Sequence, residues 1–364
     1  MPPTTTDTTP NPFTTGCRES GSLHTNRPMF KHLKYALHSG KPNKPLYFLR
    51  EFSKMAVPDA LYRSRLSARL ARIKSRPDYP ELLQRVDYYI RLHSPFSLPE
   101  ADKYERGNTW VHYLGTISGY RRNMCCSAYY FDQHNITRHF PAHLRWSYCP
   151  GDVYFTPEVP TIVKSRLLSD DNHCSVLLKL DSLRHFMFVN DKKPFRDKAD
   201  KLIFRGKIRN SRLRTAFMER FCHHPIADCG IVGHNEGSPC DWMAEKKTIR
   251  EHLDYKFIMA LEGNDVASNL KWVMSSNSLA VMTRPTCETW FMEGRLQAGL
   301  HYVEVKEDFS DLEEKLHYYI AHPNEAEAII ANAHDYIQPF LDAEREEDIA
   351  LLVLERYMKL SGQI

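Results

Sequence analysis

The feature of this chain that most limits its fold is a regular alternation of strand-like and helix-like segments after Lys201. The strand-like run KLIF precedes the helical pattern SRLRTAFMERF, YKFIMAL precedes SNLKWVMSSN, and HYVEVK precedes DLEEKLHYYI. Short apolar runs bounded by turn residues are typical of buried strands, and apolar residues at helical spacing are typical of packed helices. Because strands that alternate with helices form a parallel sheet covered on both faces, we expect an α/β domain here.

The part of the chain before this alternation has a different pattern. Between Thr109 and Asn190 the apolar residues occur in short runs separated by turn residues, which predicts strands. A length of 364 residues is typical of two domains, and the Thr-, Pro- and Ser-rich start is typical of a disordered tail. The predicted division is a tail over 1–28, an N-terminal domain over 29–195, a C-terminal domain over 196–341 and a closing amphipathic helix over 342–364.

Charge and hydropathy argue against two classes of protein. The 49 Lys and Arg stand beside 45 Asp and Glu, so the net charge of +4 gives no global field for wrapping a nucleic acid. No apolar run approaches the roughly 20 residues that a bilayer-spanning helix needs. Nine cysteines at irregular spacing, and a start without the apolar core of a signal peptide, predict a cytoplasmic protein. Because the net charge is small, any anion site in this chain must be local.

A basic helix is predicted over residues 60–76, in the sequence ALYRSRLSARLARIKSR. Leu61, Leu66, Leu70 and Ile73 can share one face, which leaves most of the bases on the other. One interpretation is a surface helix with a solvated basic face, and the other is contact with a membrane surface or a polyanion. A nucleic-acid-binding function would depend on this helix alone, and the near-balanced total charge argues against it.

The first chemically distinctive segment follows the strand-like LIF and leads into a predicted helix. Its polar residues are Arg205, Gly206, Lys207, Arg209, Asn210 and Arg212. In an open parallel sheet, ligands bind beyond the carboxyl ends of the strands, where loops lead into helix N-termini. Several cations and free backbone N–H groups at the positive end of a helix suit a diphosphate. The charges alone fit an exposed basic loop equally well.

A second such segment follows YKFIMAL. It contains the predicted turn residues Glu262, Gly263, Asn264 and Asp265, and then Ser268, Asn269 and Lys271, which open the next helix. Serine or asparagine in the first turn of a helix is usually only a cap. Two polar helix starts on successive units of one parallel sheet nevertheless converge at the same edge, which favours a shared anion site.

A group transfer at a bound diphosphate would need a carboxylate to take the proton of the attacking hydroxyl. We expect that carboxylate to come from the N-terminal half, across the cleft. That half offers Asp132, Asp152, Asp170 and Asp171, and their spacing does not choose among them. Each of them, taken singly, also fits an exposed turn.

Motifs for other chemistries are weak or absent. A cysteine and histidine cluster lacks the paired spacing of a structural zinc site; its members are Cys222, His223, His224, Cys229, His234 and Cys240. The chain has no GxxxxGK[ST], no GxGxxG after a strand and no GxSxG. P-loop, dinucleotide-binding and hydrolase functions are therefore not indicated, and we expect no metal site.

Several of these segments together resemble the family-90 glycosyltransferases, which include bacterial lipopolysaccharide transferases and eukaryotic protein O-glucosyltransferases. The matching segments are PGDVYFTPEVPTIVKSR, SVLLKL through RHFMFV, KLIFRG, YKFIMALEGNDVASNLKWVMSSNS, ETWFMEG and HYVEV followed by DFSDLEEK. They extend from about Trp146 to Leu341, and their order and spacing are specific to the family rather than to parallel sheets in general.

The resemblance implies a GT-B-like α/β architecture, with two Rossmann-type domains facing a cleft and the C-terminal helix packing back on the N-terminal domain. It also implies an acceptor-side N-terminal domain, a nucleotide-sugar-binding C-terminal domain and an inverting mechanism. The UDP-sugar is then a donor substrate, and no obligatory metal or other cofactor is expected.

The resemblance also implies roles for individual residues. Asp152 matches the family's aspartate and becomes the expected base, with Asp132 as the alternative. The donor contacts fall on Lys207 and Arg212, and on Ser268 and its neighbours. Arg205, Gly206 and Gly263 belong to the same two loops, whereas Arg209, Arg214 and Arg220 become ordinary surface or helix charges. The family's eukaryotic members have a serine at the position of Lys207, and an arginine where this chain offers Asn269 or Lys271. Glu288 is expected to bind the ribose hydroxyls or orient a loop, and Trp290 to stack on a ring; packing is an equal alternative for both.

We therefore expect transfer of a hexose or pentose from a UDP-sugar to a lipopolysaccharide core or other surface polysaccharide. The expected partners are the donor, a glycan or lipid-linked glycan acceptor and the surface of the inner membrane, but no nucleic acid. The alternative is a non-catalytic nucleotide- or carbohydrate-binding protein on the same scaffold, because a fold does not guarantee chemistry.

Overall fold

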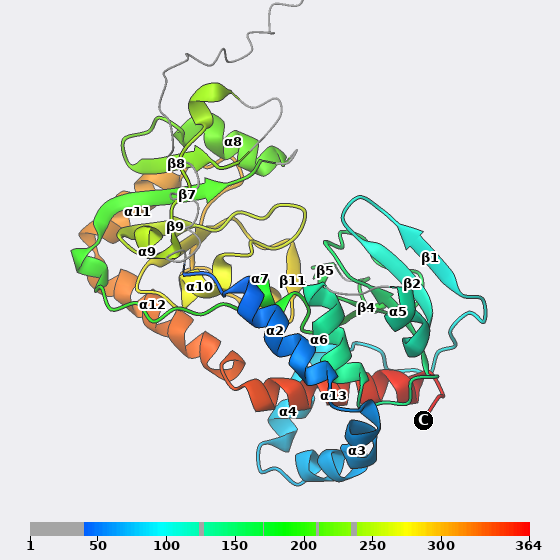
Figure 1. Ribbon diagram of the computed structural model, residues 1–364. Coiled ribbons are helices and arrows are strands. Elements are labelled where there is room, and N and C mark those ends of the chain that lie inside the picture. Colours follow the sequence, from blue (N-terminus) through cyan, green and yellow to red (C-terminus); the bar gives the residue numbers. More distant parts are fainter. Residues whose placement is uncertain (1–39, 124–126, 170, 209–210, 234–238) are drawn as a thin grey trace, which may run out of the picture.

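The computed structural model describes residues 40–364 except 124–126, 170, 209–210 and 234–238 (Figure 1). The described chain is mixed α/β, with two five-stranded sheets and one two-stranded sheet. The predicted tail over 1–28 lies outside the described residues. No helix in the described ranges is both long and apolar enough to cross a bilayer.

The C-terminal sheet is entirely parallel, as the strand and helix alternation predicts. Its strands are β7 (Ala199–Gly206), β8 (Ala227–Ile231), β9 (Tyr255–Met259), β10 (Leu279–Met282) and β12 (Val303–Glu304), in the order β12-β10-β9-β7-β8. The central strands are buried on both faces because helices cover each side.

Five α-helices accompany this sheet in the described chain. They are α8 (Arg212–Phe221), α9 (Ile249–His252), α10 (Leu270–Met274), α11 (Leu312–Ala321) and α12 (Pro323–Ile337). Phe217 and Phe221 of α8 pack with Phe204 of β7 in a hydrophobic cluster on one face of the sheet. Ser211 begins α8 as its N-cap, with its side chain accepting a hydrogen bond from the backbone N–H of Arg214. The helix predicted after β9 is present but short.

The N-terminal sheet is mixed, which differs from the expected Rossmann type. Its strands are β1 (Lys103–Arg106), β2 (Val111–Thr116), β3 (Arg145–Cys149), β4 (Thr161–Val163) and β6 (Ser175–Leu177), in that order. β1, β2 and β3 are antiparallel neighbours, and only β3, β4 and β6 are parallel. The loop between β1 and β2 is too short for a crossover helix, so these two strands must form a hairpin.

Helices surround this sheet and close the chain. They are α2 (Lys44–Met55), α3 (Asp59–Lys74), α4 (Tyr79–Tyr89), α5 (Ile117–Asn123), α6 (Ala128–Thr137), α7 (Ser182–His185) and α13 (Ala343–Leu360). Short 3₁₀ turns occur at Phe195–Asp197, Cys240–Trp242, Glu293–Arg295 and Gln338–Phe340. One hydrophobic cluster includes side chains from both halves, such as Trp146 of β3, Ile258 of β9 and Leu351 of α13.

The closing helix packs back on the N-terminal half, as predicted. α13, red in Figure 1, contacts α4 and α6. The Tyr357 hydroxyl donates to the carbonyl oxygen of Pro160 at 2.7 Å, and the Gln363 amide donates to that of Arg145 at 2.8 Å. The C-terminus of the chain is therefore part of the N-terminal half.

The basic helix predicted over 60–76 corresponds to α3, and its cations are largely neutralised by α13. Arg69 pairs with Asp348 at 3.0 Å, and Lys74 pairs with Glu355 at 3.2 Å. Because these bases have acidic partners in the same chain, α3 is not a freely solvated basic face.

A two-stranded sheet joins the two halves of the molecule. β5 (Ser165–Leu167) pairs antiparallel with β11 (Cys287–Thr289), which places Arg166 opposite Glu288. Both side chains are fully buried, and their ion pair measures 2.8 Å. Backbone hydrogen bonds and a buried ion pair therefore fix one half against the other beside the cleft described below.

Candidate active site

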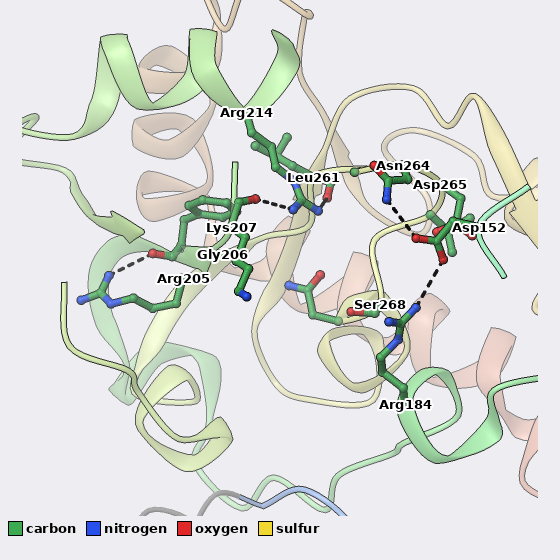
Figure 2. A pocket seen from close by; sticks show the side chains of 14 residues that line it. Asp152, Arg184, Arg205, Gly206, Lys207, Arg214, Leu261, Asn264, Asp265 and Ser268 are labelled. Atoms are coloured by element: carbon green, nitrogen blue, oxygen red, sulfur yellow. Dashed lines mark hydrogen bonds and ion pairs between the residues drawn. The ribbon is translucent and has the colours of Figure 1, made fainter. Parts of the chain in front are cut away.

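Two loops of the C-terminal sheet meet the N-terminal half at one cleft (Figure 2). β8 lies on one side of β7 and β9 on the other, so the strand order switches direction between β7 and β9. Such a switch point opens a crevice at the carboxyl ends of parallel strands. The cleft is lined from the N-terminal half by Asp152 and Arg184. The predicted convergence of the two polar junctions is confirmed.

The loop after β7 brings Arg205, Gly206 and Lys207 to the cleft. A Cβ on Gly206 would lie 2.7 Å from the Phe204 ring, so a larger residue would displace that core side chain. The Arg205 guanidinium points away from Asp152 (Figure 2). It pairs with Asp228 of β8 at 2.5 Å. Lys207 is exposed, and no acidic partner is found for it among the described residues. Among the described residues of this loop, Lys207 is therefore a side chain that is available to an anion.

Arg214 of α8 also lines the cleft. Its guanidinium donates to the carbonyl oxygens of Lys207 at 2.7 Å, Leu261 at 2.8 Å and Glu262 at 3.0 Å. These three carbonyl groups belong to the loops that follow β7 and β9. Arg214 therefore fixes the two loops to each other.

The structure reverses the expected roles of the two arginines in α8. Arg212 is exposed and does not line the cleft, whereas Arg214 is half-buried beneath it. Residues two positions apart in a helix point in nearly opposite directions, so only one of the pair can face the loops. Arg209 and Asn210, also predicted near the phosphates, lie outside the described residues.

The loop after β9 brings Gly263, Asn264, Ser268 and Asn269 to the cleft. A Cβ on Gly263 would lie 2.9 Å from the Arg214 guanidinium, so glycine allows the close approach of that side chain. The Asn269 amide donates to the carbonyl oxygen of Met259 at 3.0 Å. This bond holds the start of α10 against the end of β9.

Lys271 does not reach the cleft, contrary to its predicted contact with phosphate. It is fully buried in α10, and its ammonium group forms an ion pair with buried Glu293. The residues that follow it in this short helix, Trp272 and Val273, are also buried in the core. Lys271 is therefore a structural residue.

Asp152 faces these loops from the turn after β3. Its Oδ1 lies 2.6 Å from the ammonium of Lys164, and its Oδ2 accepts a hydrogen bond of 3.1 Å from the Asn264 amide. The Arg184 guanidinium is 3.6 Å from Oδ1 and also pairs with Asp181 at 3.1 Å. The side chain of Asp152 keeps 15% exposure, so the carboxylate is held firmly but remains accessible.

Lys164 is shared between two carboxylates at the centre of this arrangement. Its ammonium lies 2.6 Å from Asp152 and 2.6 Å from Asp265, and its side chain is only 1% exposed. The Ser165 hydroxyl donates to Asp265 at 2.8 Å. Because Asp265 belongs to the loop after β9, Lys164 and Ser165 connect the base side of the cleft to the donor side.

The charges around Asp152 favour its ionised form. Burial by itself raises the pKa of Asp152, but Lys164, Asn264 and Arg184 outweigh burial and hold the pKa below its ordinary value. Burial, together with the nearby charge of Asp152, raises the pKa of Asp265 above its ordinary value. Burial lowers the pKa of Lys164, but the two carboxylates more than offset it, so the ammonium stays charged.

The alternative base, Asp132, lies in a different place. It is on α6 and lines a separate cavity between α2, α6 and α13. Its carboxylate accepts hydrogen bonds from the Ser182 backbone N–H at 2.8 Å and from the Ser182 hydroxyl at 2.7 Å. Asp132 therefore anchors the start of α7 and does not line the cleft of Asp152. Of the other candidates, Asp171 is exposed outside the cleft, and Asp170 lies outside the described residues.

Glu288 and Trp290 are fully buried among protein side chains, which supports the packing alternative for both and not the donor contacts. Glu288 is fully buried, pairs with Arg166, and accepts a hydrogen bond from the Tyr88 hydroxyl. Trp290 is also fully buried and stacks on Tyr89 with ring centroids 3.8 Å apart. The motif ETWFMEG thus strengthens the junction between the halves.

A second cavity adjoins the cleft. The cleft itself encloses about 240 Å³, whereas the adjoining cavity encloses about 800 Å³. They have five lining residues in common: Arg184, Arg205, Lys207, Ser268 and Asn269. Together they fall in the size range of binding sites for ligands larger than a monosaccharide.

No group of three metal-binding side chains occurs among the described residues. In the sequence cluster considered for zinc, His223 instead pairs with Asp241 at 2.9 Å. His234 of that cluster lies outside the described residues. The expectation of a metal-independent site stays a prediction.

Sequence reasoning missed Lys164 and Arg184, and it misassigned Arg214. A signal for Lys164 was present, because a lysine that directly follows the buried strand Thr161–Val163 rarely stays buried without an acidic partner. No local signal marks Arg184. Its role depends on the path of the chain from α7 to the turn after β3.

Comparisons with known proteins find a matching family and related individual proteins. Residues 178–362 match the model of glycosyl transferase family 90. The chain is 41% identical over 307 residues to the O-glucosyltransferase LpsA of Dichelobacter nodosus, covering 84% of this chain and 92% of that protein. It is also 26% identical over 183 residues to the uncharacterized protein 035R of Invertebrate iridescent virus 3, covering 44% of this chain and 16% of the viral protein.

Proposed function

The chain belongs to glycosyltransferase family 90, and we propose that it transfers a sugar from a UDP-sugar to a glycan acceptor with inversion at the anomeric carbon. The observation that carries the proposal is the position of Asp152. An accessible carboxylate with a depressed pKa faces two polar loops at the switch point of a parallel sheet. We also propose that the two halves act as the acceptor and donor sides of a GT-B-like enzyme.

The donor diphosphate would lie between the loops after β7 and β9. Lys207 supplies a positive charge there, and Ser268 supplies a hydroxyl. Backbone N–H groups of the same loops can donate to phosphate oxygens, as they do at other loop-to-helix junctions. Arg214 keeps the two loops at a fixed separation and supports the site without contacting the donor. No metal is needed if these groups balance the charge of the leaving diphosphate.

Asp152 would act as the general base. The acceptor hydroxyl gives its proton to the carboxylate while its oxygen forms a bond to the anomeric carbon. The bond from that carbon to the diphosphate oxygen breaks, and UDP leaves with the electron pair. Lys164 and Asn264 keep the carboxylate ionised and aimed at the cleft before the acceptor arrives.

The donor sugar and the acceptor are the parts of the proposal that depend most on the relatives. The bacterial relative is named an O-glucosyltransferase, so UDP-glucose is the first donor to test among hexoses and pentoses. A lipopolysaccharide core, or another surface polysaccharide, is the proposed acceptor. The adjoining cavity gives room for an acceptor larger than one sugar.

A donor screen tests the proposal directly. Purified protein is incubated with UDP-sugars and candidate acceptors, and released UDP is measured. We expect release with at least one pair and loss of release in Asp152→Asn. Full activity of Asp152→Asn would remove Asp152 from the mechanism. If UDP raises the melting temperature but no pair gives turnover, the chain is a non-catalytic nucleotide-binding protein.

A further inference from the structure

Helix α2 has a row of exposed apolar side chains on its outer surface. Leu46 is 63% exposed, Leu49 68% and Phe52 47%. These residues recur every three positions, so they lie within about 120° of one another around the helix. Met55 is 38% exposed but lies on the side opposite Leu46. Single exposed apolar residues are ordinary, but a row of three on one face of a helix indicates a contact surface.

The opposite side of α2 already anchors the helix to the protein. The rings of Tyr47 and Phe131 are 6.4 Å apart in an edge-to-face contact. Glu51 is 2% exposed and accepts a hydrogen bond of 2.8 Å from Asn135 of α6. Phe52 also contacts the Phe131 ring, with centroids 5.1 Å apart, whereas Leu46 and Leu49 extend from the outer surface of α2.

Positive charges flank the apolar row. The stretch 40–58 contains four cations, Lys41, Lys44, Arg50 and Lys54, and one acid, Glu51. Glu51 pairs with Arg50 and Lys54 on the anchored side. Burial lowers the pKa of Lys41, and the charges of Lys44 and Lys246 lower it further, so three ammonium groups gather at the start of α2.

We propose that α2 docks on an anionic lipid surface. The row Leu46, Leu49 and Phe52 would enter the boundary between headgroups and acyl chains, and the lysines would contact lipid phosphates. This combination of an apolar row and basic flanks is typical of helices that lie in the membrane interface. The basic helix α3, in contrast, has three of its five cations paired with acids of α13.

A second copy of the chain fits this surface less well. In a twofold dimer through α2 the same patch meets itself, so the lysines at the start of one helix would face either the same lysines or Lys54 at the end of the second helix. An anionic bilayer instead offers opposite charge to the lysines and apolar chains to the row. The charge pattern therefore favours lipid over self-association.

The docking surface is next to the opening of the active site. Lys41, Lys44 and Phe48 line the larger cavity, which has Lys207 and Ser268 in common with the cleft of Asp152. Docking through α2 would hold this opening at the lipid surface. On the proposed function, the acceptor would then be a lipid-linked glycan that stays in the bilayer during transfer.

Vesicle binding by the full chain tests the docking surface without donor or acceptor. Phosphatidylcholine vesicles with and without phosphatidylglycerol are sedimented, and bound protein is measured. We expect binding to the anionic vesicles, weakened by added salt because the lysine contacts are screened. The double variant Leu46→Ser with Leu49→Ser should bind about tenfold more weakly or worse, since two apolar side chains no longer enter the interface.

The control is Leu300→Ser, which removes a leucine of 38% exposure from the loop before β12 and should leave vesicle binding unchanged. Equal binding by the parent and the double variant would overturn the proposal, as would no binding by the parent. A concentration-dependent dimer, seen by light scattering and abolished by the double variant, would assign the row to a second copy. Absence of sugar transfer with intact vesicle binding would refute only the proposed enzyme function.

Discussion

The turn that carries Asp152 and the helix that carries Asp132 place two aspartates of the N-terminal half in opposite surroundings. Asp152 has an ammonium group at 2.6 Å, an amide donor at 3.1 Å and a guanidinium at 3.6 Å. Asp132 has only neutral donors, two of them from Ser182. The net charge of the partners therefore differs more than the number of hydrogen bonds.

This difference moves the two pKa values in opposite directions. Burial raises the pKa of Asp132 to about 7, because neutral donors do not compensate for lost hydration and the charges of Asp181 and Glu51 are close. Burial also acts on Asp152, but cations outweigh it. A general base must be ionised to accept a proton, and Asp152 is the aspartate that has cations beside it. Five experiments test this difference and the contacts on the donor side of the cleft.

The largest expected effect is the loss of activity in Asp152→Asn. An amide cannot take the acceptor proton, so kcat should fall by roughly 10²- to 10⁴-fold, the usual contribution of a general base. Asp132→Asn should keep kcat within about twofold of the parent, because Asp132 does not line the cleft. Steady-state UDP release measures both. The assignment of the base fails if Asp132→Asn is the less active of the two.

Lys164→Met should remove the nearest cation from Asp152. Two carboxylates would lose the ammonium that they have in common, and breaking a buried pair in this way typically costs about 3–5 kcal/mol of unfolding free energy. In any folded fraction, the acidic limb of the pH profile of kcat/KM should move to higher pH. Urea unfolding and pH-dependent UDP release check these effects. An unchanged acidic limb would show that Lys164 does not control the ionisation of Asp152.

Asp132 should make the free energy of unfolding fall as the pH rises from about 4 to about 7. In this window the folded protein keeps the proton on Asp132, whose pKa is raised to about 7, whereas the unfolded chain, with the ordinary pKa, has lost it. The effect amounts to at most a few kcal/mol, and it should disappear in Asp132→Asn. Urea unfolding at several pH values compares the two proteins. The same slope in both would assign it to other groups.

On the donor side, Arg214→Met and Arg212→Met form a matched pair. Loss of three hydrogen bonds to carbonyl groups should cost about 1–3 kcal/mol of unfolding free energy in Arg214→Met. KM for the donor should also rise, because the two loops lose their connection. Arg212→Met should change neither quantity, since Arg212 is exposed. Equal effects of the two substitutions would contradict the role given to Arg214.

The smallest expected effect is that of Lys207→Ala. Loss of one exposed charge contact with the diphosphate should weaken UDP binding by about tenfold without affecting the fold. The control is Lys201→Ala, which removes an exposed lysine of β7, the strand that precedes Lys207, outside the cleft. Isothermal titration with UDP measures both. If Lys201→Ala weakens binding as much as Lys207→Ala, the effect comes from general charge and not from a contact.

Local patterns in the sequence predicted the parallel C-terminal sheet and the two polar junctions. These features depend on local patterns, because strand and helix periodicity is read within about ten residues and loops at the carboxyl ends of parallel strands must meet at one edge. The motif resemblance added the base, because the spacing of the aspartates did not distinguish Asp152 from Asp132.

Only the tertiary structure decided which polar residues face the cleft. Arg214 faces it and Arg212 does not, because two positions along a helix reverse the direction of a side chain. Lys271 and Glu288 are buried by partners distant in sequence. Lys164 connects both sides of the cleft through contacts 12 residues away on one side and across the halves on the other. Local sequence fixes the elements, but ion pairs between distant segments depend on packing that no single segment encodes.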